Sequence, residues 1–377
     1  MARHLTLAIG GAFAAAGVIA VLASQAEPVP AAAPPLQVSA AALQNTAFVQ
    51  NGVSSYPLAP AKADMERVAA YWSPERLKQA SSYEPSTKPS APAATRKATT
   101  SAAELSRTHA QRTVTPLPEN RLAATAPPMV GKVFFKVGAK EYWCSASVVH
   151  SKYRNLVATA GHCAYALAQD RPVENWIFIP SYQDGRADAG IFVGHTLYMH
   201  EDFAGKGDFD RDYAFVTVHR GFTWQPYTEA GKVKYRPVDT GRVEDKVGAF
   251  RFSTGKSAGQ RLTVFGYPAG AQPDGTRPFT GQVVRRCAGT TEKKLVSAPT
   301  WQLDHGVRLP GCGFTSGASG GPWVIGYNSV KRTGHLVGVT SLTWNLTGGG
   351  RLDAISAPYF STLTQRVYAQ ATREFTG

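Results

Sequence analysis

Three short segments of the sequence hold the residue types that nucleophilic catalysis needs. Ser319 lies in the segment GASGGP, His162 lies in TAGHC, and Asp212 opens the segment DYAFV. A serine hydroxyl needs a histidine base to attack a carbonyl carbon, and that histidine needs a carboxylate to fix its tautomer. Glycines beside the serine allow the close backbone approach that stabilises a developing oxyanion. The three segments therefore indicate acyl transfer through a Ser–His–Asp triad.

In the order TAGHC, DYAFV and GASGGP, the three segments resemble those of the chymotrypsin/trypsin-like serine peptidases. The similarity is strongest to the secreted bacterial members, including the glutamyl-endopeptidase branch. It covers about two thirds of the chain, from Val130 to the C-terminus. The resemblance implies a serine endopeptidase that acts on protein or peptide substrates, with His162 as general base and Ser319 as nucleophile. It also implies that Gly317 and Ser319 supply the N–H groups of the oxyanion hole.

The carboxylate has three candidates close together, Asp208, Asp210 and Asp212. The apolar run after Asp212 matches the family's pattern of an aspartate, one residue, an alanine and two apolar residues. Asp212 is therefore the expected triad member, and the other two are expected to be solvated loop acids.

Two other functions use similar residues. A relative that has lost catalysis could keep the fold as a binding module, but here every triad residue is present. An esterase could use the same triad, and GASGG also fits the G-x-S-x-G elbow of α/β-hydrolases. The α/β-hydrolase triad runs Ser, acid, His, and the short β-rich segment after Ser319 holds only one poorly placed histidine, His335.

The sequence departs from animal trypsins at two positions. Ala318 stands where trypsins have the aspartate that receives the new N-terminal ammonium on activation. Gly313 stands six residues before Ser319, where trypsins have the aspartate that binds Arg or Lys. An insertion in this loop would move Gly313 away from the pocket base and could bring Asp304 closer to it. Without this carboxylate a buried ammonium is costly to desolvate, so we expect no preference for basic side chains. By resemblance, the other pocket walls are small hydroxyl side chains: Ser316, Thr340, Ser341 and Thr343.

All four cysteines follow residue 140, and none forms a C-x-x-C pair, which argues against a zinc ribbon. An even number in an exported chain indicates two disulfides, and four cysteines permit three pairings. The resemblance implies Cys144–Cys163, which leaves Cys287–Cys312. We expect no metal and no other cofactor.

The 377 residues carry a net charge of +14. This charge can favour anionic partners or acidic substrates, but solubility and general charge balance explain it better. No basic block with interleaved aromatic residues is present, so we expect no nucleic-acid partner. The expected state is a monomer.

The N-terminal third differs in composition from the rest. Residues 1–26 have the charged start, apolar run and small-residue end of a secretory signal, with an uncleaved anchor as the alternative. Residues 27–128 are rich in Ala, Pro and Ser, and are expected to form a largely disordered leader. Residues 65–77 interrupt this composition and predict two short helical turns, with Ser73 as N-cap before Pro74. They resemble leaders of secreted bacterial trypsin-like peptidases, and we consider a pro-segment and a simple tether equally.

From Met129 onward, short apolar runs alternate with turn residues, which indicates an all-β sandwich or barrel. The resemblance selects two six-stranded antiparallel β-barrels, residues 129–240 with His162 and Asp212, and residues 241–377 with Ser319. The site would lie between them. Residues 358–375 predict a C-terminal helix. The expected strands are 130–137, 143–150, 156–159, 176–180, 191–193, 214–218, 248–252, 262–265, 281–284, 323–325 and 336–341.

Overall fold

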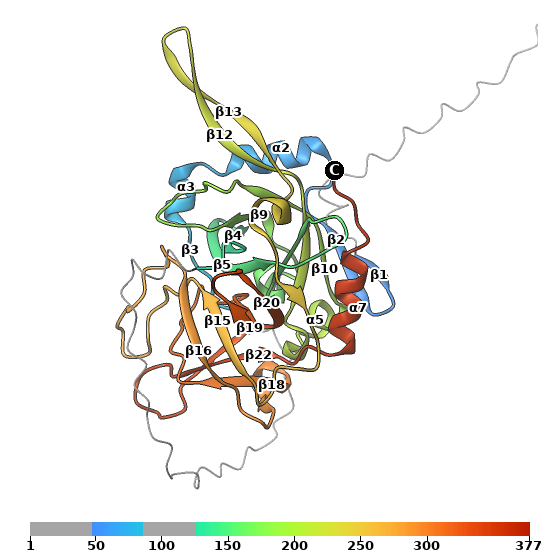
Figure 1. Cartoon of the computed structure of the whole chain (residues 1–377), viewed down its shortest axis with the longest axis vertical. Coiled ribbons are helices and arrows are strands. Elements are labelled where there is room, and N and C mark those ends of the chain that lie inside the picture. The colour runs from blue at the N-terminus through green and yellow to red at the C-terminus, as the bar shows by residue number, and fades with distance from the viewer. Residues whose placement is uncertain (1–46, 86–125) are drawn as a thin grey trace, which may run out of the picture. The chain divides into compact units, whose positions relative to one another are not determined.

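The computed structural model describes residues 47–85 and 126–377 (Figure 1). The expected signal peptide, residues 1–26, lies outside the described residues. Within residues 47–85 and 126–377, every helix is too short or too polar to cross a membrane.

The first barrel is a closed sheet of six antiparallel strands. Its strands are Val-, Ile- and Phe-rich runs that pack well on a pleated surface, and β9 closes the barrel by pairing with both β4 and β10. Val133, Phe134 and Phe135 in the middle of β4 are fully buried. The six strands are β4 (Val130–Val137), β5 (Lys140–Val148), β6 (Leu156–Thr159), β9 (Glu174–Pro180), β10 (Phe192–His200) and β11 (Ala214–Val218).

The second barrel is open, because its strands are divided between two sheets. One sheet has the order β14-β20-β19-β15-β16, and the other β17-β18-β22-β21. The expected all-β architecture with two barrels is confirmed. The strands are β14 (Arg251–Phe252), β15 (Arg261–Gly266), β16 (Arg285–Thr290), β17 (Val296–Ala298), β18 (Leu303–Pro310), β19 (Pro322–Asn328), β20 (Thr333–Val339), β21 (Leu342–Trp344) and β22 (Ala354–Pro358).

Several parts of the fold differ from the expected strands, and β17, β18, β21 and β22 of the second barrel were not predicted. Residues 281–284 are not a strand, and the strand β16 begins at Arg285 instead. A long hairpin of β12 (Gly221–Glu229) and β13 (Lys232–Gly241) was not predicted, and Figure 1 shows it extending from the first barrel. Its turn places Ala230 and Gly231 at positive φ, which suits a two-residue hairpin loop. Short elements in the connections are β7 (Tyr165–Ala166), η2 (Leu167–Gln169), β8 (Arg171–Pro172), α5 (Glu201–Lys206), α6 (Val243–Val247) and η4 (Pro299–Trp301).

The expectation of a largely disordered leader is wrong for residues 47–85, which fold onto the first barrel. The strand β2 pairs along β10 and so extends the first sheet. The predicted N-cap is confirmed, because the backbone N–H of Arg76 donates to Ser73 Oγ at 3.3 Å, with Pro74 at the first helical position. The elements are β1 (Phe48–Gln50), β2 (Val53–Pro57), α2 (Lys62–Tyr71), α3 (Pro74–Gln79) and β3 (Ser81–Ser82).

A few large side chains hold this leader segment to the barrel. Trp72 is fully buried, and its Nε1 donates to the carbonyl of Asn175 at 2.6 Å. Val53, Val68 and Leu77 are buried as well. Burying each such side chain stabilises by about 1.5–3 kcal/mol, so a few anchors are enough to order a segment whose average composition is polar and Pro-rich.

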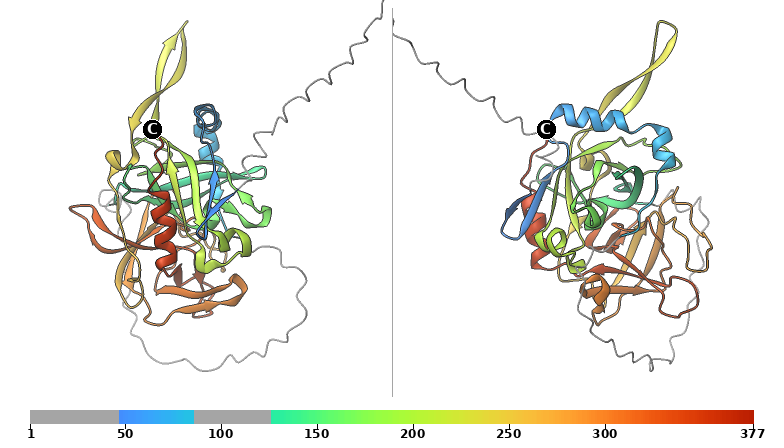
Figure 2. Two further views of the ribbon diagram at one scale, coloured as in Figure 1. Left: turned by 90° about the vertical axis from the view of Figure 1, so that its right-hand side faces the viewer. Right: turned by 180° about the vertical axis from the view of Figure 1, so that it is seen from behind.

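The C-terminal helix α7 (Thr362–Ala371) is shorter than the predicted 358–375 and begins at a capping box on Ser361. Figure 2 shows that it returns to the first barrel, where it contacts β10 and β11. Beyond α7, the Glu374 carboxylate accepts hydrogen bonds from Thr217 Oγ1 at 2.6 Å and Thr196 Oγ1 at 3.0 Å. Residues after α7 are therefore hydrogen-bonded to strands β10 and β11 of the first barrel.

Glu374→Gln is expected to lower the free energy of unfolding by about 2 kcal/mol at neutral pH, because it removes a charged acceptor of hydrogen bonds. Burial acts to raise the pKa of Glu374, but hydrogen bonds from His195, Thr217 and Thr196 outweigh it, and the net shift is downward. Because the pKa of Glu374 is lower in the folded than in the unfolded chain, its ionised carboxylate stabilises the folded state at pH values above the unfolded pKa. This stabilisation is lost as the pH falls through the pKa of the folded state. Urea titrations at about pH 7 and about pH 3 measure the difference.

The difference between wild type and Glu374→Gln should therefore shrink in acid. Glu229→Gln on the exposed hairpin is the matched control and should change stability little. An equal loss at both pH values would contradict the role of the Glu374 charge.

Candidate active site

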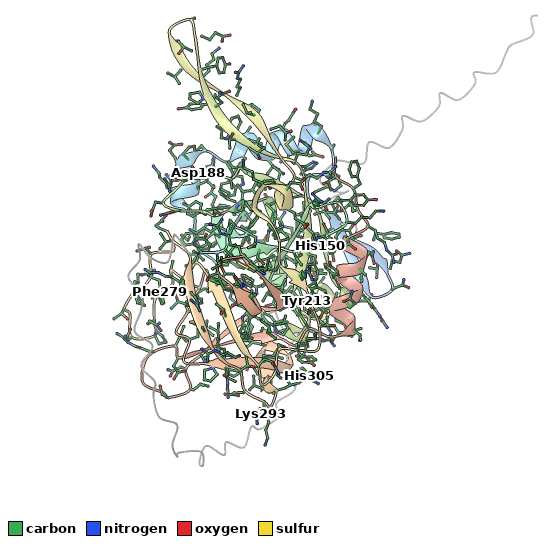
Figure 3. All side chains as sticks on the ribbon, in the orientation of Figure 1. His150, Asp188, Tyr213, Phe279, Lys293 and His305 are labelled. Atoms are coloured by element: carbon green, nitrogen blue, oxygen red, sulfur yellow. A yellow bond between two sulfur atoms is a disulfide. The ribbon has the colours of Figure 1, made fainter. Side chains whose placement is uncertain are left out.

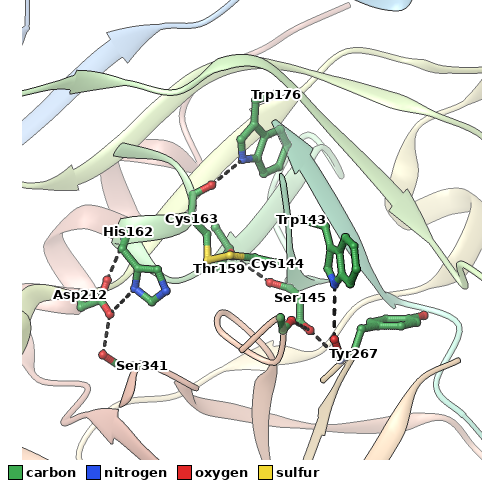
Figure 4. The surroundings of a disulfide bond; sticks show 11 residues. Trp143, Cys144, Ser145, Thr159, His162, Cys163, Trp176, Asp212, Tyr267 and Ser341 are labelled. Carbon is green, nitrogen blue, oxygen red and sulfur yellow. Dashed lines mark hydrogen bonds and ion pairs between the residues drawn. A yellow bond between two sulfur atoms is a disulfide. The ribbon is translucent and has the colours of Figure 1, made fainter. Parts of the chain in front are cut away.

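The Asp212 carboxylate is fully buried at the start of β11, directly after the helical turn η3 (Phe209–Arg211). It accepts hydrogen bonds from the backbone N–H of His162 at 2.9 Å, from His162 Nδ1 at 2.8 Å and from Ser341 Oγ (Figure 4). A proton on Nδ1 that faces the carboxylate leaves Nε2 as the basic nitrogen of the ring. The arrangement thus sets the tautomer that a general base requires.

His162 lies on η1 (Gly161–Cys163), the turn that follows β6. A Cβ at Gly161 would lie 2.9 Å from the Phe203 ring and 3.1 Å from Asp212 Oδ1, so glycine allows the close approach. The Phe209 ring stacks on the imidazole with centroids 6.3 Å apart. The turn is also tied to β5 by the adjacent disulfide, so the imidazole is held from several sides.

The structure contains the two expected disulfides, Cys144–Cys163 and Cys287–Cys312. The first joins β5 to η1 beside His162 (Figure 4). Its two sulfur atoms lie close to the imidazole, but they are bonded to each other and cannot bind a metal as thiolates.

Ser319 lies in the loop before β19, against the strand end that carries His162. Its carbonyl accepts from the backbone N–H of Ser145 at 2.8 Å. A Cβ at Gly320 would lie 2.1 Å from Thr159 Oγ1 and 2.9 Å from Ala160 N, and its φ is +78°. Only glycine permits this contact, which places the nucleophile loop next to TAGHC.

The hydrogen bond between Ser319 Oγ and His162 Nε2 is not formed. Within the described residues, Nε2 is a buried nitrogen without a hydrogen-bond partner. The nucleophile–base bond of a triad is often loose without substrate and tightens in the complex. The unpartnered Nε2 can therefore accept a proton once a donor hydroxyl comes within hydrogen-bond distance.

The carbonyl groups of the loop before Ser319 are held by hydrogen bonds from both barrels. The Ser316 carbonyl accepts from the N–H groups of Ala269 at 2.9 Å and Gly270 at 3.1 Å, and the Gly317 carbonyl accepts from Ser145 Oγ at 2.8 Å. Gly317 has a φ of +91°, which favours glycine. The N–H groups of Gly317 and Ser319, by contrast, donate to no acceptor among residues 47–85 and 126–377.

The expected pocket residues are only partly free to contact a substrate. Thr340 is buried, and its hydroxyl accepts from Trp323 Nε1 at 3.0 Å. The Ser341 hydroxyl bonds Asp212, whereas Thr343 is exposed on β21.

At the expected base of the pocket, the Gly313 carbonyl accepts from Gln272 Nε2 at 3.1 Å. Ser316 Oγ lies 3.1 Å from Ser82 Oγ of the leader. The alternative carboxylate, Asp304, is exposed and accepts from Ser297 Oγ at 3.2 Å.

The expectation that Asp210 is a solvated acid is wrong. Its buried carboxylate accepts from the backbone N–H groups of Asp304 at 3.0 Å and His305 at 2.7 Å, and lies 2.6 Å from His305 Nδ1. His305 lies on β18 of the second barrel (Figure 3). Asp208 is half-buried, caps η3 by accepting from Asp210 N at 2.8 Å, and has its pKa raised by burial. These contacts depend on the second barrel, which the local sequence does not reveal.

The leader also reaches the site, where the sequence leaves a pro-segment contact and a simple tether as equal alternatives. The strand β3 pairs in parallel with β5, and the N–H of Tyr83 donates to the Trp143 carbonyl at 3.0 Å. The Tyr83 ring stacks on His162, with centroids 6.2 Å apart and planes at 26°. The leader therefore covers the imidazole.

Comparisons with known proteins agree with this geometry. Residues 122–362 match the family model "Trypsin". Two solved structures are similar at 28% identity and a TM-score of 0.51: the thermostable serine protease AL20 from an extremophilic microorganism, and the protease Anisep from Arthrobacter nicotinovorans. The alignments cover 67% and 66% of this chain, and 100% and 98% of the respective structures.

A Glu endopeptidase structure aligns at 15% identity with a TM-score of 0.47, over 69% of this chain and 96% of that structure. A comparison with curated protein sequences found no match.

Proposed function

The chain belongs to the trypsin family, and we propose on this basis that it is a secreted serine endopeptidase acting through an acyl-enzyme intermediate. The observation that carries the proposal is the pair of His162 and the buried Asp212 beside the glycine-flanked Ser319. A buried, hydrogen-bonded carboxylate that orients an imidazole is the arrangement that activates a serine hydroxyl.

In the proposed mechanism, His162 Nε2 takes the proton of Ser319 Oγ as this oxygen attacks the carbonyl carbon of the scissile peptide bond. The N–H groups of Gly317 and Ser319 donate to the negative oxygen of the tetrahedral intermediate. His162 then gives its proton to the leaving amine, and the C–N bond breaks to leave an ester on Ser319. A water molecule, deprotonated by His162, attacks that ester and releases the acid and free Ser319.

Asp212 stays ionised through this cycle and stabilises the imidazolium form of His162. Ser341 assists by donating a third hydrogen bond to the same carboxylate. The role of Ser341 is therefore in the triad network, and the substrate pocket depends on other side chains.

The oxyanion hole is proposed to form without an ionic activation switch. Ala318 is buried against Gly266, where a Cβ would lie 3.2 Å from the alanine Cβ, and it offers no carboxylate to an N-terminal ammonium. Neutral hydrogen bonds from Ser145, Ala269 and Gly270 hold the loop instead.

Residues 27–128 are proposed to include a pro-segment, since residues 47–85 pack on the catalytic part and end beside His162. Two disulfides suit an oxidising compartment outside the cytosol. Export through the signal of residues 1–26 is consistent with both features.

Ser319→Ala is expected to lower kcat/KM for peptide hydrolysis by about 10⁴-fold or more, because nucleophile and general-base catalysis are lost together. Stoichiometric labelling by a fluorophosphonate, located by mass spectrometry, measures the nucleophile directly. Ser257→Ala, at a buried serine of the second barrel, is the matched control. The test uses mature protein without the leader: mature protein that neither labels nor cuts peptides would favour the binding-module alternative, and mature protein that cleaves only esters would favour the esterase.

The enzyme is expected to show no preference for Arg or Lys before the cut, because no carboxylate lies at Gly313 and Asp304 bonds Ser297 at the exposed surface. The expected pocket residues are small and uncharged, which suits a polar, acidic or modest apolar side chain, although the Thr340 and Ser341 hydroxyls are bonded within the protein. Fluorogenic peptides that differ only at this position, with Arg, Lys, Glu, Leu or Ala, measure kcat/KM. Values for Arg or Lys well above the others would refute the expectation.

A further inference from the structure

Tyr83 of the leader fills an aromatic socket beside His162. Its ring makes edge contacts with Phe135 at a centroid distance of 5.2 Å and with Tyr142 at 5.0 Å. Only 8% of Tyr83 is exposed. Phe135 is fully buried in β4 and Tyr142 is half-buried in β5, so the socket is part of the first barrel. The socket is built by the catalytic part and filled by the leader.

The backbone contacts show that the leader uses a free sheet edge. Ser81 and Ser82 align with Tyr142 and Trp143 of β5, on the side of these residues away from β4. An unpaired edge of this kind binds extended peptides by strand addition. With the leader removed, the Trp143 carbonyl that accepts from the Tyr83 N–H becomes available to another peptide.

The leader covers the site without being bound as a substrate. Among the described residues, no leader carbonyl accepts from the N–H of Gly317 or Ser319, where a scissile carbonyl has to bind. His162 is only 1% exposed under Tyr83 and Phe209. An imidazole so covered cannot pass its proton to a leaving amine.

We propose that the socket of Phe135 and Tyr142 is a substrate subsite for an aromatic side chain, and that Tyr83 keeps the full chain latent by filling it. The subsite lies on the leaving-group side of the cut, because His162 protonates the leaving amine and the socket adjoins its ring. The inference rests on the proposed endopeptidase function, which it deepens by naming a substrate feature.

The full-length chain tests the socket through Tyr83→Ala, with Tyr235→Ala on the exposed hairpin as the matched control. Loss of the buried ring should speed fluorophosphonate labelling of Ser319 by roughly tenfold to a hundredfold, while Tyr235→Ala labels as wild type does. p-Cresol, the side-chain analogue of tyrosine, should bind Tyr83→Ala in calorimetric titrations, slow its labelling again, and not bind wild type.

The same Tyr83→Ala chain should cleave peptides with Phe or Tyr in the first two positions after the cut faster than peptides with Ala or Asp there. Labelling and cleavage without aromatic preference or p-cresol binding would overturn the subsite and leave the peptidase intact. Binding of p-cresol to a chain that never labels would overturn the peptidase function, since the calorimetric signal does not depend on activity. If Tyr83→Ala unfolds, Tyr83→Leu gives the same comparison.

A second, independent observation concerns Ser145 on β5. Its buried hydroxyl donates to the Gly317 carbonyl at 2.8 Å and accepts from the Tyr267 N–H at 2.8 Å, while its backbone N–H donates to the Ser319 carbonyl at 2.8 Å. One residue of the first barrel thus holds both ends of the segment that carries the two oxyanion N–H groups. The structure assigns Ser145 as a positioning residue of the oxyanion hole.

Ser145→Ala is expected to lower kcat by about tenfold to a hundredfold with little change in KM, because the Gly317 carbonyl loses its buried partner and the N–H groups lose their alignment. Affinity for a peptide boronate, which mimics the tetrahedral intermediate, should fall in parallel. Ser147→Ala is the matched control, since Ser147 is buried on the same face of β5 and its hydroxyl has no partner in the described chain.

The variants are compared in the Tyr83→Ala background so that the site is open. An unchanged kcat, or a rise in KM alone, would overturn the assignment, and so would a lower Tm without loss of boronate affinity. Ser145→Gly, which removes the hydroxyl without adding an atom, gives the same comparison if Ser145→Ala does not fold.

Discussion

The Asp212 carboxylate is a charge taken out of water, and such a charge costs several kcal/mol unless it is fully hydrogen-bonded. Its donors come from both barrels, His162 from the first and Ser341 from the second. Docking of the barrels therefore completes the hydrogen bonds to the charged carboxylate and brings the residues of the site together in one step. Asp210 repeats the arrangement two residues earlier, with donors from β18 of the second barrel. A chain that fails to dock its barrels would lose the Ser341 hydrogen bond to Asp212 and the donors of β18 to Asp210.

The oxyanion loop depends on the same interface, but through neutral groups. Ser145 of the first barrel, and Ala269 and Gly270 of the second, engage the carbonyls around Gly317. A loop held this way needs no new N-terminal ammonium to take its shape, so the catalytic geometry can exist before any processing. Under the proposed function, activity is controlled by access to His162, beside which the Tyr83 ring lies.

The sequence predicted the parts of the site that are local in the chain, namely the three motif segments and the glycines around Ser319. The strands of the first barrel were also predictable, because short apolar runs such as 214–218 are separated by turn residues. Contacts between distant segments were predictable only where the family resemblance implied them, as for the two disulfides. The average composition of residues 27–128 does not indicate that a few side chains, such as Trp72, are buried. A carboxylate such as Asp210 is expected in solvent as long as its hydrogen-bond donors on β18 are not known. Substrate preference stays a prediction, because Ser341 and Thr340 use their hydroxyls within the protein.

The position of the leader has a consequence for how dilution would act on the enzyme. While the chain is continuous, the contacts between the leader and the catalytic part are intramolecular and do not depend on the protein concentration. If the chain is cut between Pro85 and Ala126, the same contacts become a bimolecular complex whose occupancy falls with total concentration. Dilution therefore favours dissociation of the cut leader, and a high concentration favours the complex. Under the proposed function, the cut chain stays blocked in a confined space and becomes active as it spreads into a larger volume.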